Sequence, residues 1–123
     1  MSPGEMKKKV LLVEDTPVIL KMAKFRLEKS GFDVVEAQSG EEALELVNRC
    51  APDIVLLDYG LPGIDGGEVC RRLKSDKKFK SIPVIIFTAT IENFQLVKDV
   101  GADDGIMKPY ESAELIEMIK KYL

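Results

Sequence analysis

Carboxylate, hydroxyl and ammonium groups stand at the ends of four apolar segments of this chain. Asp58 ends a short aliphatic run and is followed by turn-forming glycines and a proline. Glu14 and Asp15 follow an earlier run. Thr88 ends a later run, and Lys108 follows a weaker one. In an open parallel sheet, chemistry collects beyond the carboxyl ends of the strands, so these groups would meet at one site. We interpret Asp58 as a carboxylate that accepts a phosphoryl group; the alternative is a strand-end aspartate that only caps a loop.

Three carboxylates placed together repel one another and cannot all stay ionised without a cation. Glu14, Asp15 and Asp58 offer only oxygen ligands, which suit Mg²⁺, and Mn²⁺ could take its place. The Thr88 hydroxyl and the Lys108 ammonium beside such an ion would complete a site for an anionic phosphoryl group. Phosphoryl transfer needs mainly positioning and charge neutralisation, and these groups supply both.

Each of these signals also has an ordinary structural explanation. An acidic pair before a helix can offset the helix dipole, and a threonine at a strand end is a common β-former. Lys108-Pro109 before a helix can simply form a turn. Only the occurrence of all the signals together, at successive strand ends, favours the chemical interpretation.

The elements that would position these groups follow a regular pattern. Short apolar runs alternate with helical patterns five times, which predicts a parallel sheet with helices on both faces. The predicted strands cover 9–13, 33–37, 54–57, 82–88 and a weak segment around 106–107, and the predicted helices cover 17–30, 40–50, 66–73, 91–100 and 112–122. The first, third and fourth strands are the most apolar and should be central. We therefore expect a doubly wound, flavodoxin-like (βα)5 fold in three α/β/α layers, with strand order 2-1-3-4-5.

Helix ends carry their own signals. Thr16 before a proline, Ser39 in a capping box and Asp65 with a glutamate three residues later are the predicted N-caps. Gly31 and Gly101 are the predicted stops of the first and fourth helices.

Length and composition bound the class of protein. At 123 residues, with 46% hydrophobic and 32% charged residues, the chain fits one soluble domain at 9–123, preceded by an N-terminal tail and strand entrance at 1–8. The net charge is −3, which gives no indication of the basic surface that direct nucleic-acid binding usually needs. No apolar run approaches the roughly 20 residues of a membrane helix, and no signal-peptide pattern is present. We expect a cytoplasmic protein without membrane insertion.

The counts of histidine and cysteine exclude several chemistries. The chain has no histidine, which excludes Ser-His-Asp and Cys-His catalysis and prevents the chain from acting as a phosphohistidine donor. Cys50 and Cys70 lack metal-ligand spacing and are expected to be buried free thiols within helices.

Five short motifs occur in order along the chain, namely VEDTP at 13–17, DYGLPGIDG at 58–66, TA at 88–89, GADD at 101–104 and KPY at 108–110. With these motifs the chain resembles the receiver domain of bacterial two-component response regulators, in particular stand-alone receivers of the chemotaxis type. The resemblance covers residues 9–123. Each fragment is weak alone, whereas the ordered set at strand ends is a strong signal.

The resemblance implies that Asp58 accepts a phosphoryl group from the phosphohistidine of a sensor histidine kinase or a histidine phosphotransfer protein. Asp15 and Asp58 would bind Mg²⁺ directly, together with the backbone carbonyl of Gly60. Glu14 would act through a metal-bound water. Phosphorylation would then switch the binding of a partner in two-component signal transduction.

The resemblance also implies roles for Thr88 and Lys108. Thr88 would donate its hydroxyl to a phosphate oxygen. Lys108 would pair with Asp58 and then with the phosphoryl group, and the Lys108-Pro109 bond is expected to be cis. Such a domain assists its own phosphorylation and its own dephosphorylation without being a turnover enzyme.

Two departures from the family pattern fall on one region. The family commonly has an aromatic residue three positions before the lysine, where this chain has Gly105, and the stretch 88–101 is shorter than usual. Glycine also weakens a strand. We expect intact phosphorylation chemistry with an atypical output switch, in which the backbone at 89–91 moves in place of an aromatic ring. An unknown downstream partner would bind the face formed by the fourth helix, fifth strand and fifth helix.

Three other functions fit parts of this sequence. A Mg²⁺-dependent phosphohydrolase would need a second carboxylate two residues beyond Asp58, where Gly60 stands. A degenerate receiver that acts only in protein interactions is disfavoured by the complete set of acidic, threonine and lysine residues, although Gly105 keeps it open. An FMN carrier would need a hydroxyl-rich loop after the first strand. Because the chain ends with the last helix, we expect no output domain, which fits a stand-alone receiver, a phosphorelay shuttle or a receiver from a larger protein.

Overall fold

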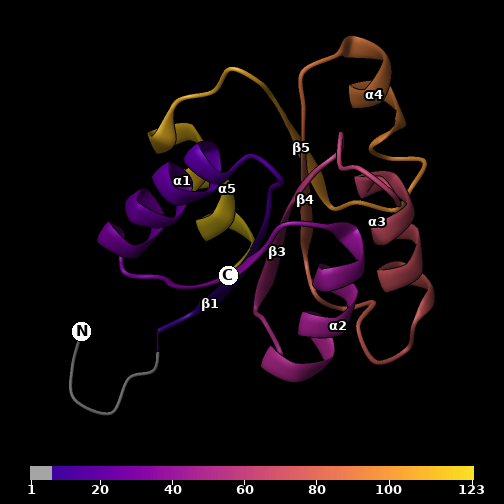
Figure 1. The fold of residues 1–123 in the computed structure, drawn as a ribbon, viewed down its shortest axis with the longest axis horizontal. Helices are drawn as coiled ribbons and strands as arrows, with labels where there is room; N and C mark the ends of the chain where they lie inside the picture. Colours follow the sequence, from indigo (N-terminus) through magenta and orange to yellow (C-terminus); the bar gives the residue numbers. More distant parts are fainter. Residues whose placement is uncertain (1–6) are drawn as a thin grey trace.

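The computed structural model describes residues 7–123, so the first six residues of the predicted tail lie outside the described part. A five-stranded parallel sheet lies between two layers of helices (Figure 1). The elements in chain order are β1 (Lys9–Val13), α1 (Pro17–Lys29), β2 (Asp33–Ala37), α2 (Gly40–Cys50), β3 (Ile54–Asp58), α3 (Gly66–Ser75), β4 (Val84–Thr88), α4 (Ile91–Leu96), β5 (Asp104–Met107) and α5 (Ser112–Tyr122). Among these residues no helix is long and apolar enough to cross a bilayer.

The strand order is β2-β1-β3-β4-β5, and every neighbouring pair is parallel, which confirms the predicted topology. The register aligns the carboxyl ends of the central strands. Asp58 pairs with Phe87, and Thr88 pairs with Met107. Glu14 follows directly on β1, so the predicted chemical groups all leave the same edge of the sheet.

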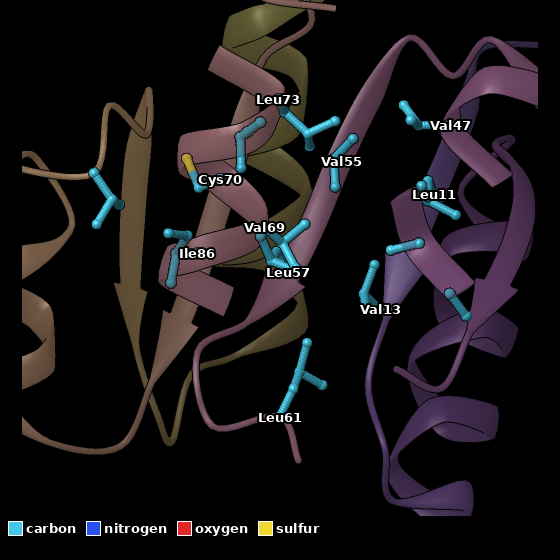
Figure 2. Packing of buried hydrophobic residues seen from close by; sticks show 14 of the residues in the cluster. Leu11, Val13, Val47, Val55, Leu57, Leu61, Val69, Cys70, Leu73 and Ile86 are labelled. Carbon is cyan, nitrogen blue, oxygen red and sulfur yellow. The ribbon is translucent and has the colours of Figure 1, made fainter. Parts of the chain in front are cut away.

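The core consists of two apolar layers, one on each face of the sheet. Val55 and Leu57 of β3 point toward α2 and α3, as Figure 2 shows for this face. Ile54 and Leu56 of the same strand belong to the opposite layer, which α1 and α5 cover. All residues of β3 and β4 are buried, as expected for strands with helices on both faces. Figure 1 shows α1 and α5 on one side of the sheet and α2 and α3 on the other.

Three predicted boundaries were wrong by two residues or more. α3 continues to Ser75, two residues beyond its predicted end. β4 begins at Val84, two residues later than predicted, because Pro83 has no N–H group to donate to the neighbouring strand. α4 ends at Leu96 instead of residue 100. The chain tightens there into shorter turns, and the Gly101 N–H group donates to the Lys98 carbonyl oxygen at 3.0 Å. Gly101, with φ +87°, ends this turn, whereas it was predicted to end the helix itself.

The predicted helix caps are confirmed for α2 and α3. The Ser39 hydroxyl accepts the Glu42 N–H group at 3.1 Å, and the Asp65 carboxylate accepts the Glu68 N–H group at 2.8 Å. Thr16 is the N-cap residue of α1 and Pro17 its first helical residue, as predicted, but the Thr16 side chain makes no cap hydrogen bond.

Of the two free thiols, only Cys70 is fully buried, and burial raises its pKa to about 11. Cys50, in the last turn of α2, is only half-buried, so the prediction of burial was wrong for this residue.

Helix α3 begins in direct contact with the backbone of Asp58. A Cβ atom added to Gly66 would lie 2.3 Å from the Asp58 carbonyl oxygen. The Gly66 N–H group donates to the Tyr59 carbonyl oxygen at 2.9 Å, which closes the loop after β3. Only glycine allows this approach, so the start of α3 fixes the backbone that carries the Asp58 side chain.

We predict that Gly66→Ala lowers the free energy of unfolding by about 1–3 kcal/mol, because the new methyl group meets backbone that cannot turn away. Helix propensity alone predicts the opposite sign, a gain of up to about 1 kcal/mol. Urea unfolding followed by circular dichroism measures the change. Gly60→Ala is the matched control, because nothing lies within 4 Å of a Cβ atom there. A Gly66→Ala protein as stable as the control would contradict the role of this contact.

Candidate functional site

The structure brings the three predicted acidic residues together. Glu14, Asp15 and Asp58 each offer a carboxylate oxygen, and these oxygens all lie within 4.8 Å of one another. Glu14 is only 3% exposed and Asp58 only 7% exposed, whereas Asp15 is half-buried. Because water reaches two of the three groups poorly, their mutual repulsion is weakly screened.

Lys108 lies against this cluster. Its Nζ atom is 3.1 Å from Asp58 Oδ1 and 3.5 Å from Glu14 Oε2. Burial opposes the charge on this ammonium group, but the two neighbouring carboxylates outweigh burial, so the pKa of Lys108 is raised. The Lys108 backbone N–H group donates to the Thr88 carbonyl oxygen at 2.8 Å, and the Lys108-Pro109 bond is cis, as expected.

The pKa of Glu14 is raised, first by burial and then by the charge of Asp58, while Lys108 and the Thr16 backbone N–H group oppose the rise. This N–H group donates to Glu14 Oε1 at 3.2 Å. An acid with a raised pKa in the folded state favours folding only while it is protonated. Its contribution is therefore lost as the pH rises through the folded-state pKa, and the ionised cluster costs stability at neutral pH.

Thr88 is 2% exposed at the end of β4, and its hydroxyl group is bound to the loop that follows. Thr88 Oγ1 accepts the Thr90 N–H group at 3.2 Å and donates to the Thr90 carbonyl oxygen at 3.4 Å. The Gly60 N–H group lies 3.4 Å from Asp58 Oδ1, so the loop after β3 folds back over the acidic side chain.

The chemistry of the acidic cluster fits a hard divalent cation. Glu14, Asp15 and Asp58 supply oxygen atoms only, close enough for one ion to contact more than one of them. Burial and then the charge of Asp58 raise the pKa of Glu14, and such an ion would relieve the repulsion between these two carboxylates.

A model of the response regulator receiver domain matches residues 10–120. This chain belongs to that family. The receiver is 39% identical over 120 residues to the alkaline phosphatase synthesis transcriptional regulatory protein PhoP of Bacillus subtilis. The match covers 96% of the receiver and 49% of PhoP, so the receiver spans about half the length of that relative.

Solved structures agree with this assignment. A putative response regulator from Chloroflexus aurantiacus superimposes with a TM-score of 0.91 at 32% identity, covering 95% of the receiver and 98% of that chain. The receiver domain of a sensor histidine kinase from Pseudomonas aeruginosa, which has a magnesium ion coordinated in its active-site cleft, gives 0.89 at 27% identity and covers 95% and 98%. Receiver domains act in two-component signalling with histidine kinases and bind Mg²⁺ at an acidic site.

The cap role of one residue beside the site was missed in the sequence. Thr90 is the partner of the Thr88 hydroxyl, and its own hydroxyl accepts the Asn93 N–H group at 3.1 Å as the N-cap of α4. The signal was present, because a threonine directly before a helical pattern is a typical N-cap. Its contact with Thr88 depends on the turn between them, which composition alone does not give.

We predict that Asp15→Asn raises the thermal midpoint in EDTA, because it removes one charge from the repelling cluster. The gain should be about 1 kcal/mol, or roughly 4 °C, since Asp15 is half-exposed and screened. Excess Mg²⁺ should raise the midpoint of the unsubstituted receiver and have little effect on the variant, because a ligand stabilises the state that binds it.

Asp33→Asn is the matched control, because Asp33 is exposed at the first residue of β2, at the opposite edge of the sheet. A magnesium response in Asp15→Asn equal to that of the control would rule out Asp15 as a ligand.

Proposed function

We propose that Asp58 is the phosphoacceptor of this receiver and that its donor is the phosphohistidine of a sensor histidine kinase or a histidine phosphotransfer protein. The observation that carries the proposal is the environment of the Asp58 carboxylate. It is nearly buried, its Oδ1 atom lies 3.1 Å from the Lys108 ammonium group, and two other acidic side chains stand beside it. A carboxylate in such a place can react with an anionic phosphoryl group only where nearby positive charge offsets the repulsion between them.

The transfer exchanges one bond for another. An Asp58 carboxylate oxygen bonds to phosphorus, the bond from phosphorus to the donor imidazole nitrogen breaks, and the imidazole leaves with that electron pair. Lys108 neutralises Asp58 before transfer and is within reach of the phosphoryl oxygens afterwards. Thr88, at the end of the next strand, would donate its hydroxyl group to one of those oxygens. Hydrolysis of the acyl phosphate by water would reset the receiver.

Asp15 and Asp58 would hold Mg²⁺ directly, together with the Gly60 carbonyl oxygen, and Mn²⁺ could substitute. Glu14 suits an indirect role through water, because one of its oxygens already accepts the Thr16 N–H group and the other faces Lys108. When bound, the ion supplies positive charge that offsets the carboxylates and the phosphoryl oxygens. The chain's own contribution is to hold these oxygens at the sheet edge with little freedom to separate.

The donor must reach Asp58 across the edge of the sheet, and an apolar face lies beside that route. Val18, Met22 and Phe25 of α1 are 67%, 53% and 60% exposed. Next to them a groove of about 570 Å³ runs between α1 and α5 and extends to Ala89 and Lys108. We infer that the phosphohistidine partner packs on this face, because the groove is continuous with the acceptor site.

A separate surface would serve the downstream partner. Ile91, Phe94 and Leu96 of α4 are 64%, 39% and 40% exposed, on the side of the fold formed with β5. We propose that this face, formed by α4, β5 and α5, binds the output partner. Such an arrangement would separate donor binding from output.

We predict that acetyl phosphate with Mg²⁺ adds about 80 Da to the receiver, the mass of one phosphoryl increment, and that Asp58→Asn prevents the addition. Intact-mass spectrometry measures both. EDTA should prevent the addition in the unsubstituted receiver. Peptide mapping that placed the increment on another side chain would contradict the assignment of Asp58.

We predict that Met22→Glu slows phosphotransfer from a histidine kinase by about tenfold or more, because an acidic side chain replaces an apolar contact worth more than about 1.4 kcal/mol. The donor is an autophosphorylated kinase that modifies the unsubstituted receiver. Phosphorylation by acetyl phosphate should be unchanged. Leu96→Glu is the matched control, an exposed apolar residue on α4. Equal loss in both variants would remove α1 as the donor surface.

A further inference from the structure

The first turn of α2 packs directly against the loop that joins β3 to α3. A Cβ atom added to Gly40 would lie 2.7 Å from Ile64 Cγ1 and 3.0 Å from the Ile64 carbonyl oxygen, and 2.6 Å from Val69 Cγ2 on α3. At the next residue of α2, Glu41 Oε2 is so close to the loop that a Cβ atom on Gly63 would meet it at 2.8 Å. Two successive residues of α2 therefore contact two successive residues of this loop.

The β3–α3 loop, residues 59–65, carries the Gly60 carbonyl oxygen that is proposed above as a ligand of the cation. Leu61, which is 6% exposed, anchors the loop in the core. Among the hydrogen bonds of the described residues, only one involves the backbone of 60–64, the 3.4 Å contact of the Gly60 N–H group with Asp58 Oδ1. With so few hydrogen bonds of its own, the loop takes its position from the groups against which it packs.

From these contacts we propose that Gly40 is a positioning residue for the divalent cation. The bare backbone of Gly40 lets the β3–α3 loop lie directly on α2, and this contact sets the place of the Gly60 carbonyl oxygen relative to Asp15 and Asp58. The inference rests on the proposed binding of Mg²⁺ by that oxygen. Helix α2 acts through the loop and not by contact with the ion.

Of the two neighbours of Gly40, the loop is the one that can yield. Val69 is 0% exposed in the core layer between α3 and the sheet (Figure 2). Helix α3 is also fixed at its start, where a Cβ atom on Gly66 would lie 2.3 Å from the Asp58 carbonyl oxygen. Ile64 is only half-buried. A side chain at position 40 would therefore displace the loop before it displaced α3.

The segment before Gly40 is itself fixed to the acidic side of the site. The Ala37 carbonyl oxygen, at the end of β2, accepts the Glu14 N–H group at 3.0 Å. The Ser39 hydroxyl then caps α2 by accepting the Glu42 N–H group at 3.1 Å. The position of Gly40 is thus defined by the sheet edge that carries Glu14, so the start of α2 is a firm support for the more weakly held loop.

The first test is a titration of Gly40→Ala with Mg²⁺, followed by the backbone amide shifts of the ¹⁵N-labelled receiver. Mg²⁺ demands a near-ideal octahedral arrangement of ligands, and loss of a group that orients a ligand costs roughly 10–100-fold in affinity. We expect the dissociation constant for Mg²⁺ to rise by about tenfold or more. Before any Mg²⁺ is added, the amide shifts of residues 60–64 should already differ from those of the unsubstituted receiver.

Val47→Ala is the matched control for a general loss of stability. Val47 is 1% exposed on the same helix, seven residues or about 10 Å along the axis from Gly40. Figure 2 shows it at the end of the core layer away from Leu61. This variant should be less stable in urea than the unsubstituted receiver, because it loses a buried side chain, and yet bind Mg²⁺ with unchanged affinity.

The second test examines the contact from the side of the loop. Ile64→Ala leaves a gap over Gly40, so it should also weaken Mg²⁺ binding. In the double variant the methyl group of Gly40→Ala occupies that gap, and the double variant should bind Mg²⁺ more tightly than Gly40→Ala. Because Ile64 is only half-buried, Ile64→Ala is expected to fold even where Gly40→Ala does not, so the contact is tested in either case.

The outcomes separate this inference from the proposed function. Failure of the unsubstituted receiver to bind Mg²⁺ would count against the proposed cation site itself. With binding established, unchanged affinity in Gly40→Ala or in Ile64→Ala would overturn the positioning role of this contact. The same holds for an equal loss of affinity in Val47→Ala, or for a double variant that binds no better than Gly40→Ala.

Discussion

The repulsion among three clustered carboxylates is the interaction on which the site depends. Glu14 and Asp58 are almost completely shielded from water, so their charges are poorly screened, and Lys108 is the cation that the described residues place within 4 Å of both. One ammonium group cannot balance three carboxylates. The folded chain therefore has excess negative charge at this site, which a bound divalent ion would reduce and an added phosphoryl group would increase again. A site that is electrostatically unbalanced in this way responds strongly to small changes in its occupants.

The sheet supplies the rigidity that keeps these charges together. The fully buried strands β3 and β4 pair at Asp58 and Phe87, one residue before Thr88. The apolar side chains of both strands pack in the same core layer, as Figure 2 shows. The contact of Gly66 with the Asp58 carbonyl oxygen adds a second constraint from α3. In contrast, the loop after β4 and the helix that follows bury little apolar surface. The carboxyl edge of the buried strands therefore lies beside a loop and a helix that are held by few buried apolar contacts.

The sequence predicted the strand order because the apolar content of the strands distinguishes central from edge positions, and it predicted the meeting of Asp58, Thr88 and Lys108 because parallel strands share one carboxyl edge. The predicted ends of strands and helices were less accurate, because they depend on single backbone groups. The missing N–H group of Pro83 delays β4, and tightened turns end α4 early. Thr16 satisfied the N-cap pattern, yet the carboxylate of Glu14 is what accepts its N–H group. The neighbours of Gly105 lie beyond such reasoning, because the approach of Val97 to β5 is a tertiary contact between segments that carry no complementary signal.

The glycine on β5 becomes understandable when the energies are compared. A switch needs two arrangements whose free energies differ by only a few kcal/mol, so that the signal can reverse their populations. A large aromatic side chain moving between a buried and an exposed position is one source of such a difference. A single hydrogen bond is worth about 1 kcal/mol, and the exchange of a neutral acceptor for a charged one adds a similar amount. For a six-residue helix with no buried residue, an exchange of this size at Thr88 is comparable to the energy that holds the helix in place. With Gly105 on β5, a switch that depends on an aromatic ring at this position has no side chain to act through in this receiver.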